Sequence, residues 1–144
     1  CSLINSFNSQ KCSILNLISP IKNNEQFIDK NNVKVVFNKE GKALYFPREP
    51  IPSAWLEQEQ DKKYMQVGVI AFSYVALRDF NKLEESSLEI SESIDMNRVL
   101  ENGGDIYLSH INYEMIGVDC ENDLNKAEEL MKLDPVFLSY NSNQ

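Results

Sequence analysis

The sequence is poor in cysteine and in positive charge. Its three cysteines, Cys1, Cys12 and Cys120, are odd in number and have no Cys-x-x-Cys spacing, so neither a disulfide framework nor a zinc site is indicated. Lysine and arginine total 14 against 22 acidic residues, a formal net charge of −8, and without a basic cluster we expect no nucleic-acid partner. No apolar run reaches the roughly eighteen residues of a membrane span. These absences favour a cytoplasmic protein without a membrane segment.

The 144 residues, 42% of them hydrophobic, are enough for one modest core. Apolar patterning predicts strands at residues 13–19, 64–72, 106–108 and 114–118, and helices at 23–27, 74–83, 89–100 and 121–132. We expect the strand at 64–72 to be covered on both faces, with a bulge or a close backbone approach at Gly68. Residues 53–63 read as an exposed loop, and 134–144 as a polar, frayed tail. Strands alternating with helices indicate an α/β sandwich.

Residues 33–52 form the most informative stretch. A β-branched and aromatic run at 33–37, turn residues at 38–41 and a second apolar run at 43–46 predict a β-hairpin. Three prolines between positions 47 and 52 then direct the backbone along a stiff, extended path that presents Arg48. A guanidinium held this way suits bidentate recognition of a carboxylate or phosphate. The alternative is a surface arginine bonded to nearby carbonyl groups.

Two further patterns have a functional and a structural interpretation. Asp119 follows a predicted strand and precedes a predicted helix, so it either binds magnesium together with phosphate oxygens or caps the helix. Glu92, Asp95 and Arg98 recur every three residues on a predicted helix. They either form part of a site or pair with one another on a solvated face.

The stretch from Asn32 to Pro52, with its Val-Lys-Val-Val and Ala-Leu-Tyr-Phe-x-Arg segments, closely resembles the middle of the CMP-Kdo synthetases, the 3-deoxy-manno-octulosonate (Kdo) cytidylyltransferases. The likeness extends over about residues 12–130 and is strengthened by Gly117-Val118-Asp119. It implies the C-terminal portion of a nucleotide-diphospho-sugar transferase-like (Rossmann-like) α/β/α sandwich, with a mixed sheet and a β-hairpin dimerisation region. Residues 1–133 would form the sugar-acid-binding and dimerisation part, and 134–144 the tail.

The resemblance also implies roles for individual residues. Arg48, Gln66, Asp95 and Arg98 would bind the sugar acid, and Asp119 would act in catalysis by holding Mg²⁺. The sequence departs from the family at Met65 and Met96, which stand where those enzymes carry polar residues, and these departures leave the identity of the sugar acid open.

The implied function is transfer of CMP from CTP to a 2-keto-3-deoxy sugar acid such as Kdo, in the synthesis of lipopolysaccharide or capsule precursors. We expect a homodimer in the cytoplasm. The family's amino-terminal nucleotide loop and its other magnesium-binding aspartate are absent from these 144 residues, so we expect the chain alone to be inactive and to belong to a longer protein.

Three alternatives remain at this point. The chain could be a non-catalytic binding or assembly module that keeps the fold. It could act on another acceptor, sialic-acid-like or a phosphonate. The Cys1-Ser2 start could also be that of a lipid-anchored surface protein, although no flexible polar tether follows it.

Overall fold

The computed structural model describes residues 7–8, 12–53, 62–111, 118 and 121–141. The chain divides into two compact units, Cys1–Tyr113 and Glu114–Gln144. The limits taken from the sequence, 1–133 and 134–144, stay a prediction. Among the described residues, no helix has both the length and the apolar character needed to cross a membrane.

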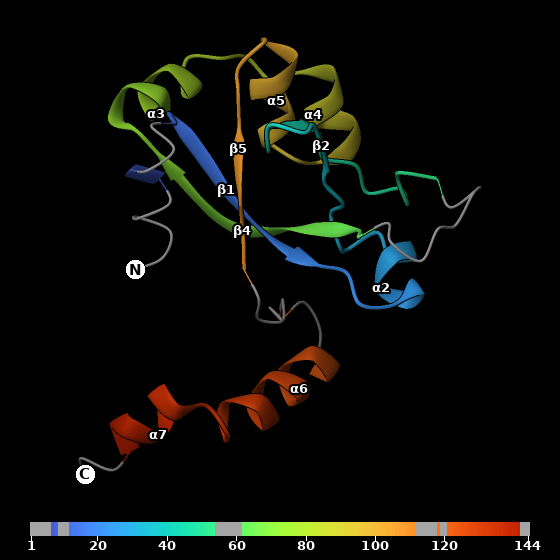
Figure 1. Ribbon diagram of the computed structural model, residues 1–144, viewed down its shortest axis with the longest axis vertical. Helices are drawn as coiled ribbons and strands as arrows, with labels where there is room; N and C mark the ends of the chain where they lie inside the picture. The colour runs from blue at the N-terminus through green and yellow to red at the C-terminus, as the bar shows by residue number, and fades with distance from the viewer. Residues whose placement is uncertain (1–6, 9–11, 54–61, 112–117, 119–120, 142–144) are drawn as a thin grey trace. The chain divides into compact units, whose positions relative to one another are not determined.

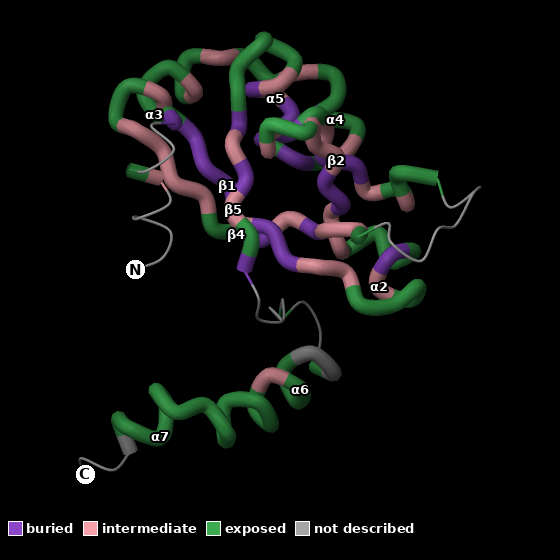
Figure 2. Tube along the Cα trace, in the orientation of Figure 1, coloured by how far each residue is buried: buried purple, intermediate pink, exposed green. Residues whose placement is uncertain are grey.

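A mixed three-stranded sheet lies at the centre of the first unit (Figure 1). β1 (Ile14–Pro20) pairs antiparallel with β4 (Tyr64–Phe72) on one side and parallel with β5 (Tyr107–His110) on the other. β1 is the central strand and is buried along most of its length (Figure 2). The strands predicted at 13–19, 64–72 and 106–108 and the mixed sheet are therefore confirmed, while the strand predicted at 114–118 lies largely outside the described residues.

The predicted hairpin is confirmed as a second, two-stranded sheet of β2 (Val36–Phe37) and β3 (Ala43–Tyr45). Gly41 in its turn has a φ of 77°, a left-handed conformation that glycine adopts without a Cβ clash. The hairpin is joined to the central sheet at both ends.

These joints close the strands into a ring. On one side, Gln66 N donates to Val33 O at 2.8 Å, and on the other, Ala43 N donates to Ile106 O at 2.8 Å. Residues 33–37, β3, β5, β1 and β4 thus follow one another around a closed circuit, which we call the strand ring. Because closure pairs strand edges with one another, the ring exposes less unpaired backbone than two separate sheets would.

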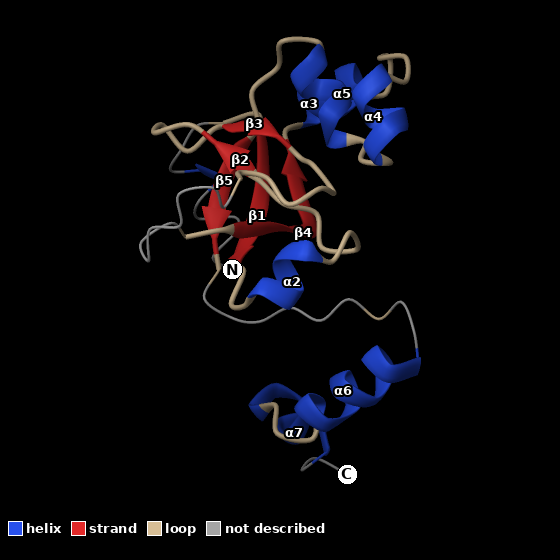
Figure 3. Ribbon diagram, turned by 90° about the vertical axis from the view of Figure 1, so that its right-hand side faces the viewer, coloured by secondary structure: helices blue, strands red, loops and turns tan. Residues whose placement is uncertain are grey.

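Among the described residues, the helices around the ring include α2 (Asn24–Ile28), α3 (Tyr74–Phe80), α4 (Ser87–Glu92) and α5 (Met96–Glu101). Asn23 and Ser73 cap α2 and α3 by accepting backbone N–H bonds. Helices α3, α4 and α5 gather at one end of the unit, away from α2 (Figure 3). The core lies between the helices and the strands and includes Ile14, Ile18, Val35, Ala43, Phe46, Ile94, Met96, Val99, Ile106 and Leu108.

One expectation about β4 needs correction. Gly68 and Val69 are exposed, so the strand is not covered on both faces along its whole length. On α3, Tyr74 and Val75 are 80% and 55% exposed, and the helix packs on the core through Ala76 and Phe80 instead. Apolar spacing therefore predicts the helix, while tertiary packing decides which of its residues face inward.

The bulge predicted at Gly68 is confirmed. Between the pairs Asn16–Ile70 and Ile18–Gln66, β1 advances two residues while β4 advances four. A Cβ built on Gly68 would meet no atom within 4 Å, so the glycine accompanies a bulge rather than a close backbone approach.

The second unit contains α6 (Glu121–Met131) and α7 (Pro135–Asn141). α6 confirms the helix predicted at 121–132. α7 corrects the expectation of a frayed tail: Asp134 accepts backbone hydrogen bonds from Val136 and Phe137 at 2.7 and 3.0 Å and so starts a helix. Most of the loop predicted at 53–63 lies outside the described residues.

Candidate functional site

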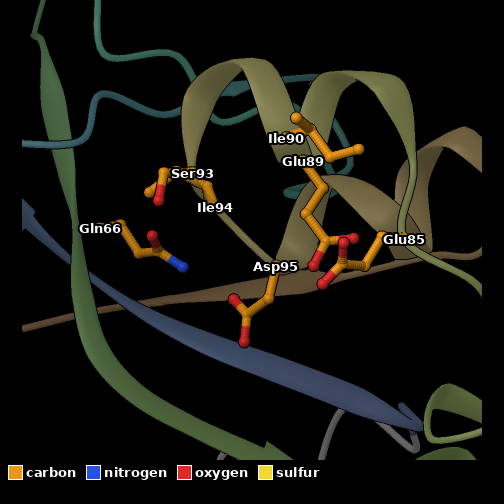
Figure 4. Close-up of a pocket in the computed structure, with 7 residues that line it drawn as sticks. All are labelled: Gln66, Glu85, Glu89, Ile90, Ser93, Ile94 and Asp95. Carbon is orange, nitrogen blue, oxygen red and sulfur yellow. The ribbon is translucent and has the colours of Figure 1, made fainter.

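A pocket of about 440 Å³ lies between β4 and the α4–α5 region. Its lining residues are Gln66, Glu85, Glu89, Ile90, Ser93, Ile94 and Asp95 (Figure 4). Gln66 reaches it from β4, whereas Asp95 reaches it from the connection between the two helices. Two of the residues singled out in the sequence therefore lie at one concave site, although they are far apart along the chain.

The side chain of Gln66 is oriented by a buried asparagine. Its Nε2 donates to Asn16 Oδ1 at 2.7 Å, and Asn16 Nδ2 donates to Val67 O at 3.0 Å across the bulge. Asn16 is fully buried, so its hydrogen bond holds the Gln66 amide in one orientation. The bulge thus has a local role: it presents the Val67 carbonyl that holds this pair of amides.

The helix predicted at 89–100 is two helices, and this break creates the pocket wall. Ser93 ends α4 with a φ of 55°, in the left-handed region, and α5 begins at Met96. Asp95 stands at the break without a side-chain cap bond. The alternative in which Glu92, Asp95 and Arg98 pair with one another is wrong, because Arg98 pairs with Glu89 and Glu92 accepts bonds from residues 45 and 48.

Arg98 instead lies behind the pocket. Its Nε donates to Glu89 Oε2 at 2.7 Å, its Nη2 pairs with Glu89 Oε1, and its Nη1 donates to Leu83 O at 3.1 Å. The guanidinium also lies over the Phe80 ring, 5.0 Å from its centroid. The hydrogen bonds from Arg98 lower the pKa of Glu89, so Glu89 presents a charged carboxylate to the pocket.

Arg48 is occupied by carbonyl groups in this structure. Nε donates to Glu92 O at 2.6 Å, Nη1 to Lys30 O at 2.9 Å and Nη2 to Ser93 O at 3.5 Å. This is the arrangement of the second interpretation given above, an arginine bonded to nearby carbonyls. Because Ser93 lines the pocket, Arg48 fixes part of its wall.

Sequence reasoning missed the network that holds residues 46–48, here called the arm. Glu92 Oε2 accepts from Arg48 N at 2.7 Å, and Glu92 Oε1 accepts from Tyr45 Oη at 2.5 Å. The bond to Glu92 raises the pKa of Tyr45 to about 12. Burial by itself would raise the pKa of Glu92, yet the bonds from Tyr45 and Arg48 lower it overall.

The amide of Asn97 completes the network. Its Oδ1 accepts from Phe46 N at 3.2 Å and its Nδ2 donates to Phe46 O at 3.1 Å, so it pairs with the backbone as a neighbouring strand would. Asn97 and Phe46 are fully buried. The signal available in the sequence was a polar residue, Asn97, between the apolar residues Met96 and Val99 on one helix.

The two methionines at which the sequence departs from the family do not line the pocket. Met65 is 7% exposed and Met96 is 1% exposed, both in the buried interior. These two departures therefore do not change which side chains line the pocket. Gln66, Ser93 and Asp95 supply the polar groups there.

Asp119 lies outside the described residues, so its role in binding Mg²⁺ stays a prediction. Among the described residues, no group of three His, Cys, Asp or Glu side chains could hold a metal ion. The carboxylates that line the pocket therefore form no such group, and the magnesium site expected at Asp119 lies outside the described residues.

Comparison with known proteins gives consistent matches. Residues 3–109 match the sequence profile of the family described as cytidylyltransferase. The chain is 40% identical over 108 residues to the 3-deoxy-manno-octulosonate cytidylyltransferase of Koribacter versatilis, covering 75% of this chain and 41% of that protein. It is 34% identical over 123 residues to the enzyme of the same name from Christiangramia forsetii, covering 85% of this chain and 50% of that protein.

A solved structure of CMP:2-keto-3-deoxy-manno-octonic acid synthetase complexed with CTP is similar in fold. The TM-score is 0.82 at 28% sequence identity, and the match covers 92% of this chain and 54% of that chain. The chain thus spans about half the length of the relatives it matches.

Proposed function

Because the chain belongs to the cytidylyltransferase family, we propose that it forms the acceptor-binding part of an enzyme that transfers CMP from CTP to Kdo or a related 2-keto-3-deoxy sugar acid. The observation that carries the proposal is the shared pocket of Gln66 and Asp95, inside the matched residues 3–109. The products are the CMP-sugar and pyrophosphate, which suits the synthesis of lipopolysaccharide or capsule precursors. The chain would act within a longer protein, in keeping with its half-length coverage of its relatives.

In the proposed reaction a hydroxyl of the sugar acid attacks the α-phosphate of CTP and pyrophosphate leaves. The protein contributes mainly alignment and charge stabilisation to such a transfer. The Gln66 amide, held by Asn16, and the Asp95 carboxylate would hydrogen-bond the hydroxyls of the acceptor. Their different acceptor and donor capacities would fix its orientation.

The charge of the pocket bears on how the acceptor lies in it. Glu85, Glu89 and Asp95 make the lining acidic, which suits sugar hydroxyls that donate hydrogen bonds and repels a carboxylate. The acid group of the substrate would therefore point away from these residues, toward Arg48. The Nη2 group of Arg48 donates one N–H to Ser93 O at 3.5 Å, and its second N–H would donate to the substrate carboxylate while this bond is kept.

Arg98 would act through Glu89 rather than by direct contact. Its guanidinium is committed to Glu89 and to the Leu83 carbonyl. It would keep the Glu89 carboxylate ionised and in place, so that the carboxylate accepts a hydrogen bond from the acceptor. The direct binding role first assigned to Arg98 becomes an indirect one in this proposal.

Asp119 would hold Mg²⁺ together with phosphate oxygens of CTP, since magnesium is commonly bound by one or two carboxylates and substrate phosphates. Bound there, the ion would neutralise charge on the triphosphate. The remaining groups that position CTP would come from the rest of the longer protein. A reaction that consumes CTP fits the cytoplasmic location expected from the cysteine content.

We also place a homodimer contact on the hairpin. Leu44 and Ile51, on and after β3, are 57% and 38% exposed, and apolar side chains at such positions suit burial between copies. Light scattering after size exclusion would measure the mass of the chain. A strictly monomeric chain at tens of micromolar concentration would contradict this part of the proposal.

A non-catalytic binding module is the second candidate, and one observation favours it. The guanidinium of Arg48 is already bonded to the carbonyls of Lys30, Glu92 and Ser93, as expected of a residue that serves the fold. Such a module would bind a polyhydroxy acid without turnover.

Pyrophosphate release with CTP and Kdo separates these candidates, measured on the 144-residue chain and on the full-length product of its gene. We expect turnover from the full-length protein, lost about tenfold or more in Asp95→Asn at fixed Kdo. Lys39→Met, an exposed change in the hairpin turn, is the control and should match the parent. A panel of sialic-acid-like and phosphonate acceptors tests the choice of acid. A full-length protein without turnover for any acceptor would remove the enzyme proposal.

A further inference from the structure

Lys34 is a fully buried lysine, only 1% exposed. Burying an ammonium group is costly unless its N–H donors are satisfied. No carboxylate among the described residues forms an ion pair with it, and burial lowers its pKa. A lysine in this environment needs an explanation, because an apolar side chain would fill the same space without that cost.

The hydrogen bonds of Lys34 explain why a lysine is buried there. Nζ donates to Asp29 O at 2.6 Å and to Arg48 O at 2.7 Å, and the backbone N–H of Lys34 donates to Pro47 O at 2.8 Å. A single residue therefore ties the end of α2 to two consecutive carbonyls of the arm. The carbonyls point into a buried site, where an unsatisfied acceptor would be unfavourable.

The arm is consequently held from both sides. Lys34 binds the Arg48 carbonyl, Glu92 binds the Arg48 amide, and the guanidinium of Arg48 binds the carbonyls of Glu92 and Ser93. Ser93 and the nearby Asp95 line the pocket. A continuous path of hydrogen bonds thus leads from Lys34 through Arg48 to the pocket wall.

We propose that Lys34 is a positioning residue for the acceptor pocket: without touching the ligand, it sets the arm so that Arg48 holds the Ser93–Asp95 turn in its binding geometry. This inference rests on the proposed function. Its motivation is independent of the pocket residues themselves, since the hydrogen bonds of Lys34 that carry it go to Asp29, Pro47 and Arg48. A displacement of the arm would move the acceptor side of the pocket and leave CTP binding, supplied elsewhere, unaffected.

The test uses the full-length protein with CTP and Kdo. Lys34→Met keeps the length and apolar stem but removes all three N–H donors. We expect the KM for Kdo to rise about tenfold or more while the KM for CTP stays within about twofold, because small displacements of positioning groups have large effects. Lys39→Met is the matched control and should change neither constant.

A second variant covers the case in which Lys34→Met does not fold. In Lys34→Arg the charge is kept, but a planar, longer guanidinium cannot place one nitrogen between the two carbonyls. We again expect a higher KM for Kdo and an unchanged KM for CTP, with a circular dichroism spectrum that matches that of the parent. A folded variant with an unchanged KM for Kdo overturns the inference. Absence of turnover in the unmodified protein would instead remove the proposed function on which it rests.

Discussion

The arm and the pocket use polar residues in opposite ways. Around the arm, Asn97, Glu92 and Lys34 are engaged with backbone groups of residues 46–48. In the pocket, Glu85 and Asp95 are exposed and have no hydrogen bond or ion pair with another side chain among the described residues. The polar side chains around the arm are bonded within the protein, whereas these two pocket carboxylates can still accept hydrogen bonds from a ligand.

The difference separates residues that build the site from residues that would contact a substrate. Changes in the arm should lower stability first, because buried partners are left unsatisfied. Changes at the exposed pocket residues Glu85 and Asp95 should leave stability almost unaltered and should instead alter binding. A change at either residue that lowers stability, or a change in the arm that does not, would contradict this division.

The largest loss is expected for Asn97→Ala. It leaves both the N–H and the carbonyl of buried Phe46 without partners, and we expect about 3 kcal/mol less stability. Denaturant unfolding of the 144-residue chain measures it. Asn102→Ala, which removes an exposed amide bonded to Arg98 O, is the control, expected within about 0.5 kcal/mol of the parent. Equal effects of the two changes would contradict the role of Asn97.

Tyr45→Phe removes the hydrogen bond to Glu92. We expect it to lower the unfolding free energy by about 1 kcal/mol at pH 8, less than Asn97→Ala does. Its pH dependence is more specific. The folded-state pKa of Tyr45 is raised to about 12 from 10.0, so its contribution is complete below pH 10 and is lost as the pH rises through 12.

Unfolding free energies at pH 8 and pH 11 measure this dependence. The parent should lose stability between these values, and Tyr45→Phe should lose less. Tyr74→Phe, at a position that is 80% exposed, should behave as the parent does. A parent and a Tyr45→Phe variant with identical slopes above pH 10 would argue against the Tyr45–Glu92 bond.

The pair of Glu89 and Arg98 predicts an effect at acid pH. Hydrogen bonds from Arg98 lower the pKa of Glu89 below its usual 4.5, so the stability it contributes is present above pH 4.5 and is lost as the pH falls through the lower folded-state value. Glu89→Gln should flatten this acid slope. Unfolding between pH 3 and pH 6 measures it, with Glu84→Gln, an exposed change, as the control. If the unfolding free energy of Glu89→Gln falls with pH as steeply as that of the parent, Glu89 does not contribute stability in this way.

The smallest change in stability is expected for the pocket. Glu85→Gln and Asp95→Asn alter exposed groups, and we expect shifts below about 0.5 kcal/mol. In the full-length protein, however, Asp95→Asn should raise the KM for Kdo. Loss of stability without a change in KM would place Asp95 with the arm and not with the pocket.

The order of strands and helices in the first unit was readable from the sequence because periodicity and turn residues act locally. The hairpin at 33–46 and the bulge at Gly68 both followed from such local signals. The break at Ser93 did not, because a serine in the left-handed region carries no propensity signal and is held by Arg48 from a distant part of the chain. Local rules therefore gave one helix where tertiary contacts make two.

The site was only partly predictable for the same reason. Gln66 and Asp95 were selected by resemblance and do share a pocket. Arg48 was selected as well, yet its guanidinium is bonded to carbonyls whose positions no sequence pattern reveals. Lys34 was passed over because a lysine inside Val-Lys-Val-Val reads as the solvent-facing member of an alternating strand. Its burial depends on α2 and the arm closing over it.

The strand ring has a consequence for how the protein is made. Its final member, β5, lies between β1 and the start of β3, which are 60 or more residues earlier in the sequence. Until residue 110 has left the ribosome, the nascent chain would hold two open strand edges, where incorrect strand pairing can begin. During synthesis the chain would therefore be prone to incorrect strand pairing until β5 emerges and inserts between β1 and β3.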